Sequence, residues 1–138
     1  MRLRIVSERI EIPKLNPDEK MIHLDFKASN VDILNLMQRC PRLRVIHVSP
    51  SYRKAMSNAL QVFLDMQGIE LLEGDIWDSP DTMGDFGGYL IVDDTTLEEI
   101  RVMAAKGLDI DEVTAQVQKK IKVSSDLIAY IVRISAAS

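Results

Sequence analysis

The chain contains 138 residues, of which 46% are hydrophobic and 28% are charged, and its formal net charge is −4. This composition is that of one folded domain and excludes a disordered chain. The single cysteine excludes an intrachain disulfide, and no segment approaches the ~20 apolar residues of a membrane span. With no export signal visible at the N-terminus, we expect a cytoplasmic protein without membrane contact.

The charges are distributed unevenly along the chain. Residues 33–64 contain five basic and no acidic side chains, whereas residues 65–112 contain two basic and 14 acidic ones. Such blocks predict a surface field with a direction, suited to steering an anionic ligand or to docking copies head to tail, so a homo-oligomer is possible. The alternative is that the two blocks neutralise each other across neighbouring elements.

Five short apolar segments predict strands. The steps between their first inward residues are 19, 24, 23 and 21 residues, which is the spacing of β/α units. Strands joined by connections of this length pair in parallel. We therefore predict an α/β fold with four or five short, mostly parallel strands, at residues 3–7, 22–26, 46–49, 69–74 and 90–94.

Helices are predicted between these strands. Ser29 and Asp32 have the spacing of a capping-box variant, at the start of a helix that Pro41 ends. Ser49 caps a second helix, whose apolar positions repeat at helical spacing until Gly68 closes it. We expect this second helix to be a single one of about four to five turns.

After residue 94 the sequence predicts two or three helices and no strands. Thr95 with Glu98 forms a capping box, and Asp109 with Glu112 begins another helix. A third follows Ser124 or Ser125, and its inward residues are Leu127, Ile128 and Ile131. We expect a single domain of residues 1–138, in which the helices of residues 95–138 pack on the β/α units of residues 1–94. The second and third of these helices resemble a helix-turn-helix.

Three segments carry a resemblance to a known family. They read "LNPDEKMIHLDF", "CPRLRVIHVSPSYRKAMS" and "FLDMQGIELLEGDIWD". The chain resembles an archaeal, methanogen-type family of small uncharacterised proteins classed as a domain of unknown function, most closely over residues 15–77. The resemblance implies a cytoplasmic archaeal setting and supplies no activity and no catalytic residues.

Two segments also match the L-x-x-L-x-L core of leucine-rich repeats. These are "CPRLRVIHVS" and "MQGIELLEG". The helix expected between them is long for that class. A short open α/β sheet and an irregular solenoid fragment both satisfy the pattern.

A pair of histidines occupies equivalent places in two neighbouring units. His23 follows Ile22 and His47 follows Ile46, so both imidazoles are expected on one sheet face, about one strand spacing (~4.8 Å) apart, with Asp25 on the same face. Two imidazoles beside a carboxylate suit acid/base chemistry or metal binding. The alternative is that they are cross-strand neighbours on a half-wet face. Because no third ligand is fixed, we predict no metal and no cofactor.

A second candidate site lies at the start of the helix that follows residue 49. Arg53 and Lys54 fall where a long helix would have its positive end, and cations there are unfavourable by ~0.3–1 kcal/mol each. With Ser49 and Ser51 they are expected to form a cradle for phosphate, sulfate or a carboxylate at the carboxyl end of the sheet. The alternative is that the two cations are solvated or pair with the acidic block. Neither common nucleotide-binding motif is present.

These observations leave three hypotheses for the function. The leading one is a small α/β binding or regulatory module for a partner protein or a small anion. The second is an enzyme acting on a phosphorylated or carboxylated metabolite, with His23 or His47 as acid/base. The third is a nucleic-acid-binding regulator acting through the C-terminal helix pair, which its few base-reading side chains and the acidic net charge disfavour. The acidic segment 78–88 is expected to be a solvated loop.

Overall fold

The centre of the protein is a five-stranded sheet, seen in the computed structural model, which describes residues 1–75, 88–121 and 123–137. The strand order is β4-β3-β2-β1-β5. The first four strands are parallel and β5 is antiparallel to β1, which confirms the predicted α/β fold. Their bounds are β1 (Arg2–Val6), β2 (Met21–Leu24), β3 (Val45–Val48), β4 (Glu70–Glu73) and β5 (Tyr89–Ile91).

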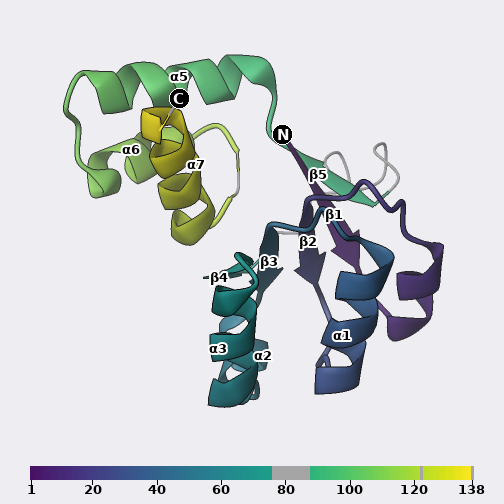
Figure 1. Ribbon diagram of the computed structural model, residues 1–138. Helices are drawn as coiled ribbons and strands as arrows, with labels where there is room; N and C mark the ends of the chain where they lie inside the picture. Colours follow the sequence, from purple (N-terminus) through teal and green to yellow (C-terminus); the bar gives the residue numbers. More distant parts are fainter. Residues whose placement is uncertain (76–87, 122, 138) are drawn as a thin grey trace.

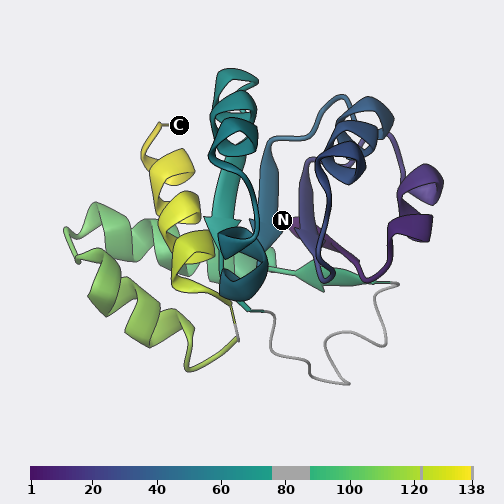
Figure 2. The same cartoon turned by 90° about the horizontal axis from the view of Figure 1, so that it is seen from below.

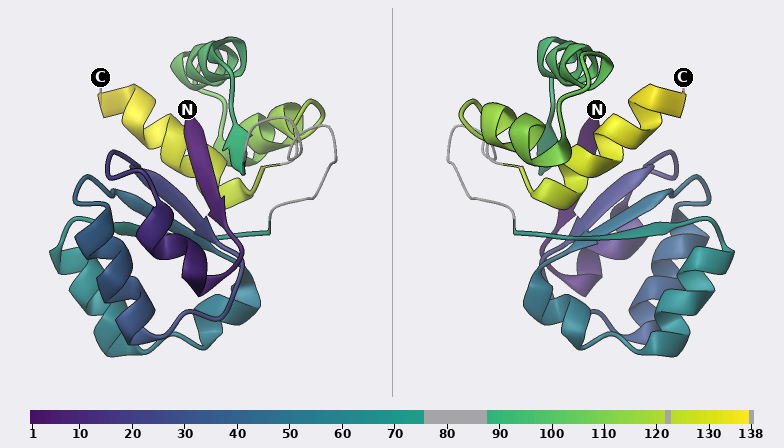
Figure 3. Two further views of the ribbon diagram at one scale, coloured as in Figure 1. Left: turned by 90° about the vertical axis from the view of Figure 1, so that its right-hand side faces the viewer. Right: turned by 90° about the vertical axis from the view of Figure 1, so that its left-hand side faces the viewer.

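Helices cover both faces of this sheet (Figures 1 and 3). One layer contains η1 (Arg9–Lys14), α1 (Asn30–Arg39), α2 (Pro50–Lys54) and α3 (Asn58–Met66). The other contains α5 (Asp94–Ala105), α6 (Ile110–Val117) and α7 (Ser125–Ala137), with α7 beside β4 (Figure 2). From β1 to β4 each strand is added on the same side of the last, so right-handed crossovers place their helices on one face. The C-terminal helices cover the face that remains.

The alternation of side chains along the strands builds two apolar cores. Ile22 and Ile46 face the η1–α3 layer, whereas Met21 and Val45 face the α5–α7 layer. Leu127, Ile128 and Ile131 of α7 are buried in the second core, as predicted. The C-terminal helices therefore share a continuous core with the sheet.

Two predicted helix starts are confirmed by their caps. The Ser29 hydroxyl accepts a hydrogen bond from the Asp32 N–H, and the Asp32 carboxylate accepts one from the Ser29 N–H. The Asp109 carboxylate accepts a hydrogen bond from the Glu112 N–H at the start of α6. Gly68, at a φ of +76°, follows α3 as predicted, and that left-handed conformation favours glycine.

Other expectations about the helices are wrong. The single helix expected after Ser49 is two helices, because the Ser57 hydroxyl accepts a hydrogen bond from the Leu60 N–H and starts α3 anew. The helix expected to begin at Thr95 begins at Asp94, because the carboxylate of Asp93 is a better-placed cap. The predicted acidic loop, residues 78–88, lies outside the described residues except for Gly88. No helix in the described ranges combines the length and the apolar character needed to cross a bilayer.

Candidate functional site

The two predicted histidines lie side by side at the carboxyl-terminal half of β2 and β3. His23 and His47 are paired in the parallel register, and their Nδ1 atoms are 2.7 Å apart. The ring centroids are 5.0 Å apart with the planes tilted by 46°. Their expected position on one sheet face is confirmed. The expected half-wet surroundings are wrong, because His23 is 2% exposed and His47 is fully buried under the α5–α7 layer.

Ser124, which the sequence predicts only as a helix start, completes this arrangement. The Nε2 atom of His47 lies 2.8 Å from the Ser124 hydroxyl. The same hydroxyl oxygen accepts a hydrogen bond from the Leu127 N–H and caps the first turn of α7. A chain of three polar groups, His23, His47 and Ser124, thus connects the sheet to the C-terminal helices. We refer to it as the His–His–Ser chain.

The burial of the His–His–Ser chain keeps its imidazoles neutral. Burial lowers the pKa of His23 from 6.5 to about 4. Burial, with a smaller contribution from the His23 ring, also lowers the pKa of His47 to about 4. In a neutral pair one Nδ1 donates and the other accepts, and the Ser124 hydroxyl can donate to or accept from His47 Nε2 accordingly. Either direction of these hydrogen bonds is thus compatible with two neutral imidazoles.

Gly74, just after β4, packs directly against Ser124 and His47 of the His–His–Ser chain. A Cβ atom added to Gly74 would lie 2.2 Å from the Ser124 Cβ and 3.1 Å from His47 Nε2, so a side chain does not fit. Asp25 is exposed, and the hydrogen bonds of the two imidazoles go to each other and to Ser124. The acid/base role of His23, His47 and Asp25 therefore stays a prediction.

The residues of the predicted anion cradle, Ser49, Ser51, Arg53 and Lys54, lie at the start and the end of the short helix α2. The Ser49 hydroxyl accepts a hydrogen bond from the Tyr52 N–H and lies 3.3 Å from the Ser51 hydroxyl. Arg53 lies 3.8 Å from the Glu73 carboxylate. Because α2 ends at Lys54, Arg53 and Lys54 occupy its last turn, where cations interact favourably with the helix dipole. The electrostatic anomaly that suggested an anion is therefore absent, and the anion site at Ser49–Lys54 stays a prediction.

The strand order gives a physical reason for this outcome. Ligands of open α/β sheets bind in a crevice where the strand order reverses and helices diverge to opposite faces. From β1 to β4 the order does not reverse, so α1, α2 and α3 stay on one face (Figure 3), and the condition for such a crevice is not met between these four strands. Among the described residues, no group of three or more His, Cys, Asp or Glu side chains is arranged to hold a metal.

Two family models divide the chain as its architecture does. The model described as the N-terminal domain of a family of unknown function (DUF1699) matches residues 2–84, which is more than half of the chain. The chain belongs to the DUF1699 family. The model described as the DUF1699 C-terminal HTH domain matches residues 95–133, the segment of α5, α6 and most of α7. We found no significant match among curated proteins or among solved structures.

In this DUF1699 protein the His–His–Ser chain joins the two segments that match the two family models. His23 and His47 belong to the first segment and Ser124 to the second. A second bond of the same kind links the Asp126 carboxylate, in the first turn of α7, to the Glu73 N–H on β4. The DUF1699 helix-turn-helix is therefore docked on the sheet by polar contacts as well as by its apolar core.

Proposed function

We propose that the protein is a cytoplasmic binding module that docks a partner protein on the outer surface of η1, α1 and α3. The observation that carries this proposal is a concentration of exposed apolar side chains. Among the described residues eight large apolar side chains are exposed, and five of them lie on this layer. An exposed apolar surface of this kind marks an interaction site more often than a free surface does. The five are Ile10, Val31, Leu34, Val62 and Met66.

The positions of Leu34 and Met66 around their helices support a shared outer surface. The flank of α1 that faces η1 carries Asp32 and Arg39, which bond to Arg9 and to a carbonyl of the η1 segment. Leu34 lies on the opposite flank of α1, toward α3. On α3, Gln61 faces the free edge of β4, and Met66 lies about 140° around the helix from it, toward α1. Leu34 and Met66 thus lean toward the same space.

The charge of this layer indicates the partner's chemistry. The four helices of this layer contain five basic side chains and three acidic ones, Glu11, Asp32 and Asp65. A complementary partner has acidic side chains around apolar anchors. Residues 65–112 of this chain hold 14 acidic side chains, so a second copy is one possible outcome of the test below.

A pair of matched variants tests this proposal. Val62→Asp with Met66→Asp adds two charges to the proposed surface, and Val102→Asp with Ile110→Asp adds them to exposed apolar positions on the other layer. Sedimentation velocity at several concentrations tests association with a second copy. A photo-crosslinker at residue 66 captures other partners, whose binding is then measured with both purified proteins. We expect the first variant to weaken binding at least tenfold and the second to leave it unchanged. Equal effects of the two variants would refute the proposed surface.

The cellular setting is part of the same proposal. The resemblance to an archaeal family and the single free cysteine, the buried Cys40, support a reducing cytoplasm. The crosslinking search for partners should therefore use a cytoplasmic fraction.

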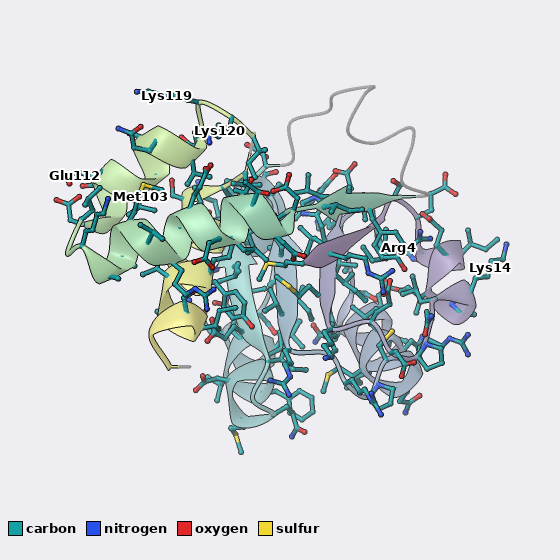
Figure 4. The ribbon with its side chains drawn as sticks, turned by 90° about the horizontal axis from the view of Figure 1, so that it is seen from above. Arg4, Lys14, Met103, Glu112, Lys119 and Lys120 are labelled. Atoms are coloured by element: carbon teal, nitrogen blue, oxygen red, sulfur yellow. The ribbon has the colours of Figure 1, made fainter. Side chains whose placement is uncertain are left out.

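Nucleic-acid binding is a second candidate, favoured by the description of the C-terminal family model as an HTH domain. Two features of the structure oppose it. Arg133 of α7, the helix that would enter the major groove, is paired with Glu70 of β4 at 2.9 Å. Lys120, which lies with Lys119 at one end of the helical layer (Figure 4), is bonded to Glu99 at 2.6 Å. Two of the described cations of the helical layer are thus engaged by carboxylates and not by phosphates.

Binding of random-sequence duplex DNA decides this second candidate. DNA binding that weakens steeply with salt and is abolished by Lys119→Glu with Lys120→Glu would establish nucleic-acid binding as a function. Retention at low salt that these two substitutions leave unchanged would refute it.

A further inference from the structure

A pocket of about 490 Å³ lies at the amino-terminal ends of β1, β2 and β3, opposite to the end where the histidines lie. Arg2, Lys20 and Arg44 line it, one at or just before the start of each strand. The parallel register, which pairs Arg4 with Ile22 and Met21 with Val45, places these three cations level with one another. Tyr130 and Ile134 of α7 contribute to its wall. The topology thus gathers cations that are distant in sequence.

The cations of this pocket are available to a ligand. Within the part of the chain that the structure describes, Lys20 and Arg44 form no ion pair, and the Arg2 guanidinium lies 4.9 Å from the Tyr89 ring centroid. Neighbouring parallel strands are ~4.8 Å apart, so the backbones that carry the three cations are close together, and the cations outnumber the two carboxylates of the lining, Asp18 and Glu19. An anion bound between them would neutralise this excess of positive charge.

A buried carboxylate in the same wall requires a hydrogen-bond donor. Glu19 lines the pocket and is 5% exposed, and its Oε2 atom accepts no hydrogen bond within the described residues. The Glu19 carboxylate contributes, after burial, to raising the pKa of the Tyr89 hydroxyl, yet Oε2 is left without a donor. A buried acceptor without a partner is unfavourable, and a ligand hydroxyl or amine would supply the missing donor.

We propose that this pocket binds a small organic anion that also carries a hydroxyl or amino group. Its carboxylate or phosphate contacts Arg2, Lys20 and Arg44, and its donor group contacts Glu19. The carbon skeleton lies against Ile134, one of the apolar residues of the wall. The pocket volume fits a metabolite-sized ligand. This site goes beyond the proposed partner surface, because it lies at the strand ends beneath α7, and either can fail without the other.

Matched pairs of anions test the proposal by calorimetry on the full chain. Glycerol 3-phosphate and propyl phosphate differ in their hydroxyl groups, and citrate and tricarballylate differ in a single hydroxyl group. In at least one pair we expect the hydroxylated member to bind about threefold to tenfold more tightly, because only it can donate to Glu19. Glu19→Gln should abolish this preference. Which pair binds shows whether the pocket takes a phosphate or a carboxylate.

A double variant of the cations tests the location of this site. Lys20→Ala with Arg44→Ala should weaken binding at least tenfold, whereas Lys14→Ala with Lys106→Ala makes the same change of charge elsewhere and should leave it unchanged. Chemical-shift changes at the Met21 methyl and the Tyr130 ring of the unmodified protein locate the anion independently of any variant. Equal weakening in both double variants, no hydroxyl preference, or no binding up to about 10 mM would overturn the proposal.

Discussion

The Nδ1 atoms of His23 and His47 lie 2.7 Å apart across β2 and β3, and His47 continues the contact to the Ser124 hydroxyl at the start of α7. This His–His–Ser chain is embedded in the apolar core between the sheet and the C-terminal helices. A buried polar group is unfavourable unless it is bonded, so a displaced α7 would leave His47 Nε2 unsatisfied. The His–His–Ser chain therefore specifies where α7 docks on the sheet.

The stability of the protein should decrease as the pH falls from about 6.5 to about 4. Burial lowers the pKa of both imidazoles from 6.5 to about 4, so in this range the unfolded chain binds protons that the folded chain does not. The neutral rings therefore give their full stabilisation above pH 6.5, and it is lost toward pH 4. The full effect is about 3 kcal/mol per ring. Urea unfolding across this pH range measures it.

The control for this pH dependence is His23→Gln with His47→Gln. The double variant is less stable at neutral pH, and its free energy of unfolding should change much less with pH. A decrease as steep as that of the unmodified protein would show that other groups, such as carboxylates, cause it.

Replacing Ser124 with alanine should destabilise the protein by about 1–3 kcal/mol. The substitution removes the cap from the Leu127 N–H and leaves His47 Nε2 buried without a partner. Ser125→Ala is the matched control, because Ser125 is exposed and should change the stability by less than about 0.5 kcal/mol. Hydrogen exchange at the Leu127 amide locates the effect. Equal losses for the two variants would contradict a special role of Ser124.

The sequence was sufficient to predict the sheet and the contact between the two histidines. The 24-residue step from His23 to His47 is the same as the step between the first inward residues of β2 and β3, so any parallel pairing in that register aligns the rings. Alternation of buried residues and the capping serine of α1 are local signals of the same kind. Each depends on residues within one β/α unit or in adjacent units.

The partners that come from distant segments could not be predicted in this way. Ser124 is 77 residues from His47, and only the docking of α7 on the second face brings them together. The same holds for Arg2 and Arg44, whose common pocket also depends on α7. The general rule for α/β sheets favoured the carboxyl ends of the strands, but strands β1 to β4 follow one another without the reversal that the rule requires.

The break between α2 and α3 predicts unequal effects of two similar substitutions. Ser57→Ala removes the cap of the Leu60 N–H and should cost about 1 kcal/mol. Ser51 is an exposed residue of α2, so Ser51→Ala should lower the free energy of unfolding by less than about 0.5 kcal/mol. Chemical denaturation of both variants measures the difference. A neutral Ser57→Ala would indicate that α2 and α3 can merge into the single helix that the apolar spacing suggests.

The close approach of Gly74 to Ser124 predicts coupled mutational effects. Gly74→Ala should cost about 2–4 kcal/mol, because its Cβ would lie 2.2 Å from the Ser124 Cβ. Ser124→Gly removes that obstacle, so in the double variant Gly74→Ala should cost about 1–2 kcal/mol less than alone. Gly68→Ala is the control: it is unfavourable through its φ of +76°, has no neighbour within 4 Å, and should add independently to Ser124→Gly. A double-mutant cycle by urea unfolding measures both couplings, and additive effects at Gly74 would mean that α7 does not pack against β4 as closely as described.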